Sequence, residues 1–234
     1  MKTCIFLTTR YGSNRLPGKH LMNINGETLT DILIKRLKHT KIPIIMCTPD
    51  TPEDNTHMKA VADRNNIGFF SGERQNIIKR HLDCAQKYGI EYIILSEGDD
   101  WLVCRETINA VYYRANELKF QKAIRTEGLP FGMNVIAYPR ENLENTGFTG
   151  DTGWGAHVTR DACILKFNYK RPYKLSMDYA QDLAIMEDVY LNCKRNQFVG
   201  GIVNYLDKHP EIALINQNKI KEYWGNIERC GKNV

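Results

Sequence analysis

The sequence predicts an α/β layered fold whose strands pair in parallel, and two observations point to it. Short apolar runs alternate with segments in which apolar residues recur at helical spacing, and this alternation runs through roughly the first half of the chain. No repeat, low-complexity tract or Pro/Gly/Ser-rich linker interrupts the 234 residues, so we expect one domain spanning residues 1–234.

The composition is that of an ordinary soluble globular protein, with 42% hydrophobic and 25% charged residues. The formal net charge of +5 is spread along the chain, which slightly favours small anionic substrates and argues against nucleic acid as a partner. No apolar run approaches the ~20 residues of a membrane span, and the N-terminal run is too short for a signal peptide. Seven scattered cysteines without a C-x-x-C pair indicate reduced thiols and no zinc site, so we expect a cytoplasmic protein.

The first expected strand, residues 4–7, leads into a loop of residues 8–19 with the sequence TTRYGSNRLPGK. Arg10, Arg15 and Lys19 place three cations on this loop. Cations combined with backbone N–H groups suit a triphosphate. A basic surface turn is the simpler alternative.

The glycines of this loop allow positive φ angles or a close approach of a ligand to the backbone. The loop is not a Walker A motif, because Lys19 lacks a following Ser or Thr. The spacing from Gly12 to Gly18 is also one residue too long for that motif.

The elements after the loop follow from spacing and from turn residues. Leu29, Ile32, Leu33 and Leu37 share one face of an expected helix. Prolines end the next apolar run and open the helix after it. We expect strands at residues 42–47 and 68–70, and helices at residues 28–38 and 52–65.

Residues 71–77 open a further helix, whose apolar face carries Ile77, Ile78, Leu82 and Ala85. Arg74 and Arg80 are candidates for contact with a nucleotide. A helix cap followed by solvated arginines is the alternative for this segment.

Residues 92–96 form the most uniformly apolar run, so we expect the central strand there. Glu97, Asp99 and Asp100 follow it. Open α/β sheets bind ligands at the carboxyl ends of their strands, and paired carboxylates there can hold Mg²⁺. Acids in a surface turn are the alternative.

The second half of the chain has weaker patterns. We expect a helix at residues 105–118, a short strand at 123–124, a strand that ends at Asp178, and a helix after it. Asp182 is expected to cap that helix. Residues 144–157 show no regular pattern and predict a mobile loop over the site or a dimer contact, and the tail from Asp207 to about Trp224 predicts a helix.

Three segments together resemble the CMP-sugar-forming cytidylyltransferases, especially CMP-KDO synthetases and spore-coat polysaccharide cytidylyltransferases. Residues 10–19 resemble the R-x-x-S-x-R-L-P-G-K signature, Asp99 falls on the aspartate of G-D-x-P-L, and Asp178 on that of V-D-T-P-E-D-L. The chain departs from the family at Trp101, which replaces proline and would reshape the acceptor side of the site. Around His157, only H-V-T of E-H-V-T is kept.

The resemblance implies a three-layer α/β/α sandwich of the GT-A-like type, with a mixed, mostly parallel sheet. It implies transfer of CMP from CTP to a sugar acid, a related sugar, or a phosphonate or phosphate ester, with release of pyrophosphate. Asp99 and Asp178 would bind Mg²⁺, while Arg15 and Lys19 would neutralise phosphate charge. The expected nucleotide contacts are Thr8, Thr9, Arg10, Gly12, Ser13, Arg15, Lys19, Arg74 and Glu97.

Two other functions are compatible with the sequence. A GT-A-type glycosyltransferase would use a nucleotide sugar, but it would normally carry D-x-D in place of Gly98-Asp99-Asp100. A non-catalytic nucleotide-binding protein would not be expected to keep both aspartates and both loop cations. For partners we expect CTP, a small-molecule acceptor and a second copy of the chain, with no membrane and no nucleic acid.

Overall fold

The computed structural model describes residues 1–13, 15–149, 153–193 and 197–220. Its strands are β1 (Thr3–Thr8), β2 (Asn23–Ile24), β3 (Glu27–Thr28), β4 (Ile44–Pro49), β5 (Gly68–Gly72), β6 (Tyr92–Glu97), β7 (Ile124–Glu127), β8 (Ile136–Pro139) and β9 (Cys163–Lys166). Its helices are η1 (Lys19–Leu21), α1 (Leu29–Lys38), η2 (Asp54–Met58), α2 (Lys59–Arg64), α3 (Ile77–Tyr88), α4 (Arg105–Glu117), α5 (Glu141–Asn145), α6 (Trp154–Val158), α7 (Ala180–Asn192), α8 (Val199–Lys208) and α9 (Pro210–Ala213).

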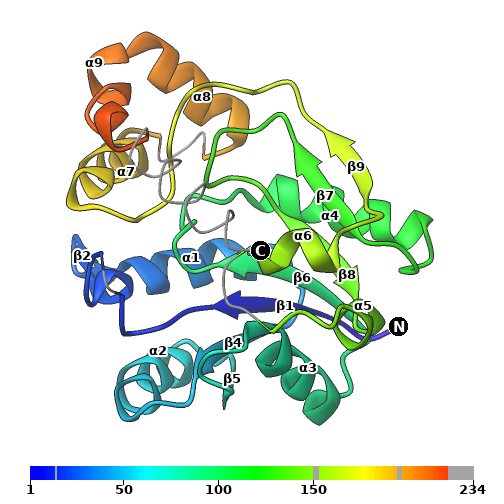
Figure 1. Ribbon diagram of the computed structural model, residues 1–234. Coiled ribbons are helices and arrows are strands. Elements are labelled where there is room, and N and C mark those ends of the chain that lie inside the picture. Colours follow the sequence, from blue (N-terminus) through cyan, green and yellow to red (C-terminus); the bar gives the residue numbers. More distant parts are fainter. Residues whose placement is uncertain (14, 150–152, 194–196, 221–234) are drawn as a thin grey trace.

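A seven-stranded sheet of order β5-β4-β1-β6-β8-β7-β9 organises the described residues (Figure 1). β1 pairs in parallel with β4 and with β6, and the register places Thr8 beside Glu97. β8 runs antiparallel to both β6 and β7. The predicted mixed, mostly parallel sheet is therefore confirmed, with β6 at its centre, and the carboxyl ends of β1 and β6 meet at one edge.

Two hydrophobic clusters lie on opposite faces of this sheet, because side chains alternate between the faces along each strand. One cluster joins Ile5 and Leu7 of β1 to α1, α2, α4, α7 and α8. The other joins Cys4 and Phe6 to α3, α5 and α6. Helices thus cover both faces, as the predicted α/β/α layering requires.

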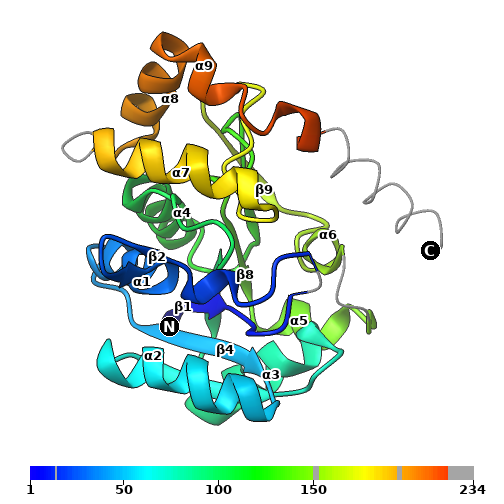
Figure 2. The same cartoon turned by 90° about the vertical axis from the view of Figure 1, so that its left-hand side faces the viewer.

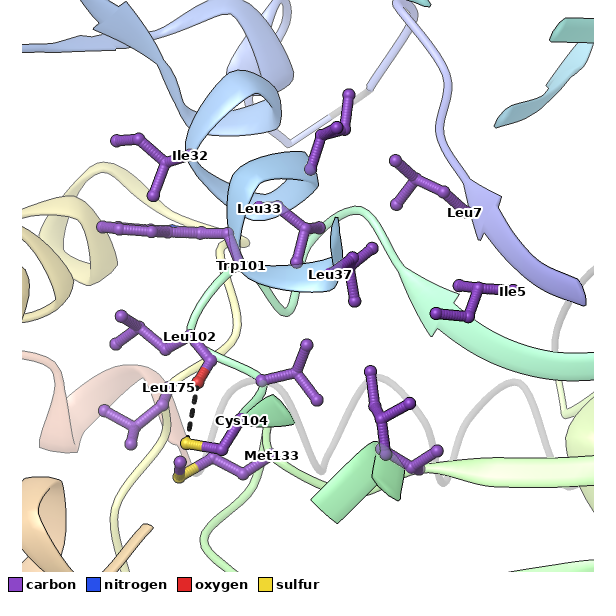
Figure 3. Close-up of a cluster of buried hydrophobic side chains, with 14 of the residues drawn as sticks. Ile5, Leu7, Ile32, Leu33, Leu37, Trp101, Leu102, Cys104, Met133 and Leu175 are labelled. Atoms are coloured by element: carbon purple, nitrogen blue, oxygen red, sulfur yellow. Dashed lines mark hydrogen bonds between the residues drawn. The ribbon is translucent and has the colours of Figure 1, made fainter. Parts of the chain in front are cut away.

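Trp101 belongs to the first cluster and is fully buried. Figure 3 shows it beside Ile32 and Leu33 of α1, and its ring meets Tyr190 edge-on at 5.8 Å between centroids. Burying so large an apolar surface stabilises the core, and an influence of Trp101 on the acceptor side stays a prediction.

α7, α8 and α9 lie together at one end of the molecule, opposite α2 and α3 (Figures 1 and 2). Arg36 of α1 links this end to the rest of the core. Its guanidinium donates to the carbonyl oxygens of Leu102 and Val103 and bonds Gln197 beside α8. The arginine is 8% exposed, so its hydrogen bonds to these carbonyls offset the cost of its burial.

The strand expected before Asp178 is wrong. Only one bridge forms there, between Phe131 and Lys174, and the chain then bends at Ser176 and again at Asp178 before α7. Gly132 explains the close approach of the two segments: its φ is +90°, and a Cβ on it would lie 2.4 Å from the Leu175 backbone.

The irregular loop expected at residues 144–157 is also wrong in part. α5 ends inside this range and α6 begins at Trp154, behind Gly153 with a φ of 77°. Residues 150–152 lie outside the described part of the chain, as do Trp224 and Cys230. A five-residue helix such as α6 is too short to show helical periodicity in the sequence.

The cysteines that the structure describes are all free, and five of the six are buried. This agrees with the reduced, structural thiols expected from the sequence. Among the described helices, none is both long enough and apolar enough to cross a bilayer.

Candidate active site

The loop after β1 turns back beneath the sheet edge and ends in η1. Gly18 adopts a left-handed conformation with a φ of 67°, which glycine tolerates without strain, whereas Gly12 does not have a positive φ. The Tyr11 N–H donates to Asp54 Oδ1 at 2.7 Å, and the Tyr11 ring stacks on His57. These contacts fasten the loop to η2, beyond the end of β4.

Lys19 lies at the centre of the site and is 3% exposed. Its Nζ is 2.6 Å from Asp99 Oδ2 and donates to the Met177 carbonyl at 2.8 Å. The same Nζ is 3.9 Å from Asp178 Oδ1. One ammonium group therefore links the loop, the end of β6 and the segment before α7.

Asp99 is the more accessible of the two carboxylates, with its side chain 32% exposed. Its other oxygen lies 3.3 Å from His20 Nε2. Burial acts to raise the pKa of Asp99, but Lys19 and His20 outweigh it and hold that pKa below its ordinary value. His20 is buried, which lowers its pKa to about 4, so its ring is neutral at pH 7.

Asp178 is only 2% exposed, and both of its oxygens have cationic partners. Oδ1 is 2.5 Å from Arg15 Nη2, and Oδ2 is 3.0 Å from Lys174 Nζ. Ser176 Oγ donates to Oδ2 as well, at 3.2 Å. A buried carboxylate needs such partners because its desolvation would otherwise cost several kcal/mol.

Asp182 holds this segment in place from the first turn of α7. Its Oδ2 accepts the N–H groups of Asp178 and Tyr179, both at 2.8 Å, which confirms its predicted capping role. The same oxygen is 2.7 Å from Lys174 Nζ, and Oδ1 accepts a hydrogen bond from Asn216. The position of Asp178 thus depends on a buried ionic cluster rather than on a strand.

A pocket of about 180 Å³ opens beside Asp99 at the carboxyl ends of β1, β4 and β6. Seven residues predicted for the site line it: Thr8, Thr9, Arg10, Arg74, Arg80, Glu97 and Asp99. His20, Pro49, Ile77 and Trp154 complete the lining. The pocket is therefore mostly polar, with Ile77 of α3 and Trp154 of α6 as its large apolar side chains.

The acids around this pocket differ in their ionisation. Burial, together with the Asp99 carboxylate, raises the pKa of Glu97 to about 7. Burial, with the nearby carboxylates of Glu97 and Asp99, also raises the pKa of Asp100 well above its ordinary value. The pKa shifts of this pair thus run in opposite directions: the surroundings of Asp99 favour its ionised form, and those of Asp100 favour its protonated form.

The remaining predicted residues lie outside this pocket. Gly12 is exposed, and Ser13 is buried with its Oγ directed to the Leu16 N–H. Arg15 and Lys19 face the two aspartates instead. Their contacts with a nucleotide stay predictions.

Sequence reasoning missed three residues that the structure brings into the site: His20, Trp154 and Lys174. His20 directly follows the loop signature, so its proximity to Asp99 had a signal in the sequence. Trp154 falls in residues 144–157, which were predicted to form a loop over the site, although its helix was not predicted. Lys174 had no signal, because it reaches the site through an irregular segment. Arg80 is 5% exposed and donates to the Glu73 carbonyl, so it lines the pocket from a fixed position.

The carboxylate oxygens of Asp99 and Asp178 are the kind of ligand that a hard divalent cation takes. Both carboxylates approach the same positive charge, that of Lys19 Nζ, so their positions suit a shared cation. Among the described residues, no group of three or more His, Cys, Asp or Glu side chains is arranged to hold a metal. A bound Mg²⁺ would therefore take its remaining ligands from phosphate oxygens and water.

Comparison with known proteins gives a consistent family assignment. A family model described as Cytidylyltransferase matches residues 4–149. The 3-deoxy-manno-octulosonate cytidylyltransferase 2 of Hydrogenovibrio crunogenus is 32% identical over 117 residues, which are 47% of this chain and 46% of that protein. This chain thus matches about half the length of that relative.

Solved structures extend the likeness to the whole fold. A cytidylyltransferase from Leptospira borgpetersenii superposes with a TM-score of 0.80 at 21% identity, covering 91% of this chain and 97% of that one. A CMP:2-keto-3-deoxy-manno-octonic acid synthetase complexed with CTP superposes with a TM-score of 0.63 at 12% identity, covering 82% of this chain and 99% of that one. A Mycobacterium tuberculosis protein in complex with manganese superposes with a TM-score of 0.57 at 14% identity, covering 80% of this chain and 97% of that one. The predicted GT-A-like fold is confirmed.

Proposed function

The chain belongs to the cytidylyltransferase family and is a nucleotidyltransferase, and from this we propose that it transfers CMP from CTP to a small acceptor, releasing pyrophosphate. The observation that carries the proposal is the convergence of Lys19, Asp99 and Asp178 beside a pocket lined by β1 and β6. Ligands bind at this edge in open α/β sheets.

In the proposed reaction, an acceptor oxygen attacks the α-phosphorus of CTP in line with the departing pyrophosphate. A new P–O bond forms at the acceptor, and the bond between the α-phosphorus and the bridging oxygen breaks. Catalysis then consists of positioning and charge neutralisation, without a covalent enzyme intermediate.

Arg15 and Lys19 are proposed to bind the β- and γ-phosphates. Their present partners are Asp178 and Asp99, so phosphate binding would exchange one anion for another around the same cations. Pyrophosphate gains negative charge as it leaves, and a fixed ammonium stabilises that charge.

Magnesium is the ion that we propose for Asp99 and Asp178. It would supply Lewis-acid stabilisation of phosphate oxygens. Asp99 is half-exposed and ionised, which supports its role as the metal ligand that is accessible from the pocket. Asp178 would join it once the cations around its Oδ1 move to phosphate.

The nucleoside is proposed to occupy the pocket between Thr8, Glu97 and Trp154. The Thr8 carbonyl already accepts the Gly98 N–H at 2.8 Å, so Glu97 and the Thr9 carbonyl are the candidate acceptors for the cytosine amino group. For the acceptor substrate, we propose a sugar acid or a related anionic sugar. Magnesium as the metal, a homodimer, a cytoplasmic location and a single domain over residues 1–234 stay predictions.

A pyrophosphate-release assay tests this function. Purified protein is incubated with Mg²⁺, one of CTP, UTP, ATP or GTP, and a panel of sugar acids, amino sugars, phosphonates and phosphate esters. We expect release that needs both CTP and one acceptor. Release with UTP at an equal rate would point to a broader sugar nucleotidyltransferase, and glycosyl transfer from a nucleotide sugar without pyrophosphate release would contradict the proposal.

A further inference from the structure

His81 lies directly beneath the pocket, between two hydroxyl groups. Its Nε2 is 3.0 Å from Thr8 Oγ1, and its Nδ1 is 3.2 Å from Tyr138 Oη. Thr8 ends β1, His81 comes from α3 and Tyr138 from β8, so three distant segments meet in this chain of hydrogen bonds. Thr8 also lines the pocket, and neither His81 nor Tyr138 does.

The imidazole of His81 is buried against aromatic rings. His81 and Tyr138 are both fully buried, and the imidazole meets the rings of Phe6 and Trp154 edge-on, at 5.5 and 5.2 Å between centroids. Burial, together with the charge of Arg80, lowers the pKa of His81 to about 3. The ring is therefore neutral and carries a single N–H.

A neutral ring leaves two directions for the hydrogen bonds. Tyr138 can donate to Nδ1 while Nε2–H donates to Thr8, or Thr8 can donate to Nε2 while Nδ1–H donates to Tyr138. In the second direction the phenolic proton of Tyr138 has no acceptor among the described residues. A buried donor without a partner is costly, so the first direction is favoured.

In the favoured direction, Thr8 Oγ1 accepts a hydrogen bond from His81, and its own proton is directed elsewhere. Among the described residues, Thr8 Oγ1 has no other hydrogen-bond partner. Its remaining accessible side is the pocket. We propose that Tyr138 and His81 act as positioning residues that hold the Thr8 hydroxyl proton toward the pocket, where it selects a hydrogen-bond acceptor on the base; this rests on the proposed use of CTP.

A fixed donor at this position distinguishes the two pyrimidines. Cytosine presents a lone pair at N3, whereas uracil presents an N–H there. A donor facing N3 gains a hydrogen bond with cytosine and faces another donor with uracil. Sites that hold a hydrogen-bonding group in a fixed direction reject a mismatched ligand, because the buried group is left unpaired.

Binding of CTP and of UTP, each with Mg²⁺, measured by titration calorimetry on the full chain, tests this inference without needing the acceptor. Tyr138→Phe removes the phenolic proton that sets the direction of the bonds. We expect the preference for CTP over UTP to fall about fivefold to tenfold in this variant. Thr8→Val should lower it by a similar factor, and Thr8→Ser, which keeps the hydroxyl, should retain it.

Tyr92→Phe is the matched control. Tyr92 is also fully buried in the central part of the sheet, but its hydroxyl donates to the Lys122 carbonyl at 2.9 Å, away from the pocket. It should lose thermal stability like Tyr138→Phe and keep the preference for CTP. Thr8 is half-buried, so Thr8→Val keeps the test decisive if Tyr138→Phe does not fold.

The outcomes separate this inference from the proposed function. A wild-type preference for CTP that survives both Tyr138→Phe and Thr8→Val would overturn the role of these residues and leave the proposed function intact. Equal wild-type affinity for CTP and UTP would overturn the selection itself. Wild-type protein that binds neither nucleotide would contradict the proposed function, and this inference with it.

Discussion

The two sides of the candidate site are built from different interactions. On the side of Lys19, Asp99 and Asp178, the contacts are mainly ion pairs, and three cationic side chains lie within 4 Å of the two carboxylates. On the side of Thr8 and His81, the contacts are hydrogen bonds between neutral groups packed against aromatic rings.

This difference corresponds to what each side is proposed to bind. Phosphates and a metal ion bring charge into the site, and ion pairs can exchange partners when such charge arrives. A base is uncharged, so it is distinguished by the directions of single protons, which must be fixed before binding. We therefore expect substitutions on the ionic side to affect turnover and stability most, and those on the neutral side to change selectivity and pH dependence.

The largest expected effect is on turnover. Asp99→Asn and Asp178→Asn should each reduce pyrophosphate release by at least about a thousandfold, or roughly 4 kcal/mol in the barrier, because each removes a proposed metal ligand. Asp178→Asn should lower the thermal stability more than Asp99→Asn does. It leaves the buried Lys174 with a weaker partner, whereas Asp99 is half-exposed. The exposed Asp63→Asn is the control. Retained Mg²⁺-dependent turnover in either variant would remove that residue from the site.

Lys174→Met should destabilise the fold strongly without touching the nucleotide pocket. It leaves the buried carboxylates of Asp178 and Asp182 facing each other without their shared cation. Removing one partner of a buried ion pair costs about 3–5 kcal/mol, to be measured by urea denaturation. Lys59→Met, which breaks an exposed pair with Asp63, should cost no more than about 0.5 kcal/mol. Equal losses in the two variants would show that the buried cluster does not hold this segment.

Lys19→Ala is expected to raise KM for CTP and to lower kcat. Loss of one charge-assisted phosphate contact removes on the order of 2–3 kcal/mol, a factor of tens to a few hundred in kcat/KM. The KM for the acceptor should barely change. Lys19→Arg should restore little, because Lys19 is 3% exposed and a planar guanidinium does not replace a compact ammonium there. A change confined to the acceptor's KM would mean that the loop faces the other substrate.

The smallest expected effect is on the pH dependence of stability. The pKa of His81 is lowered from 6.5 to about 3 in the folded protein, so the unfolded chain binds a proton more readily. The contribution of the neutral ring is present above pH 6.5 and is lost as the pH falls from 6.5 toward 3. His81→Gln should therefore make the decline in unfolding free energy shallower by about 1.4 kcal/mol per pH unit between pH 6 and 4. An unchanged slope in His81→Gln would show that the ring is not buried as a neutral group.

The amino-acid sequence alone determined the frame of the ionic side. The apolar runs of β1 and β6 are long and uniform, and parallel strands bring their carboxyl ends to one edge. The loop signature and Asp99 follow these two strands directly. Their proximity therefore follows from short-range periodicity and a general rule of sheet geometry, and so does the helix cap at Asp182.

The neutral side was decided by tertiary structure, because its members carry no periodic signal that relates them. His81 is a buried residue of an amphipathic helix, 73 positions from Thr8, and only the packing of α3 against the sheet directs its ring to that hydroxyl. Tyr138 lies on a four-residue antiparallel strand that the sequence pattern did not predict. Lys174 and Trp154 came to the site in the same way, through an irregular segment and a short helix. Periodicity indicates which face of an element is buried, but the partner that a buried polar group finds depends on which elements pack together.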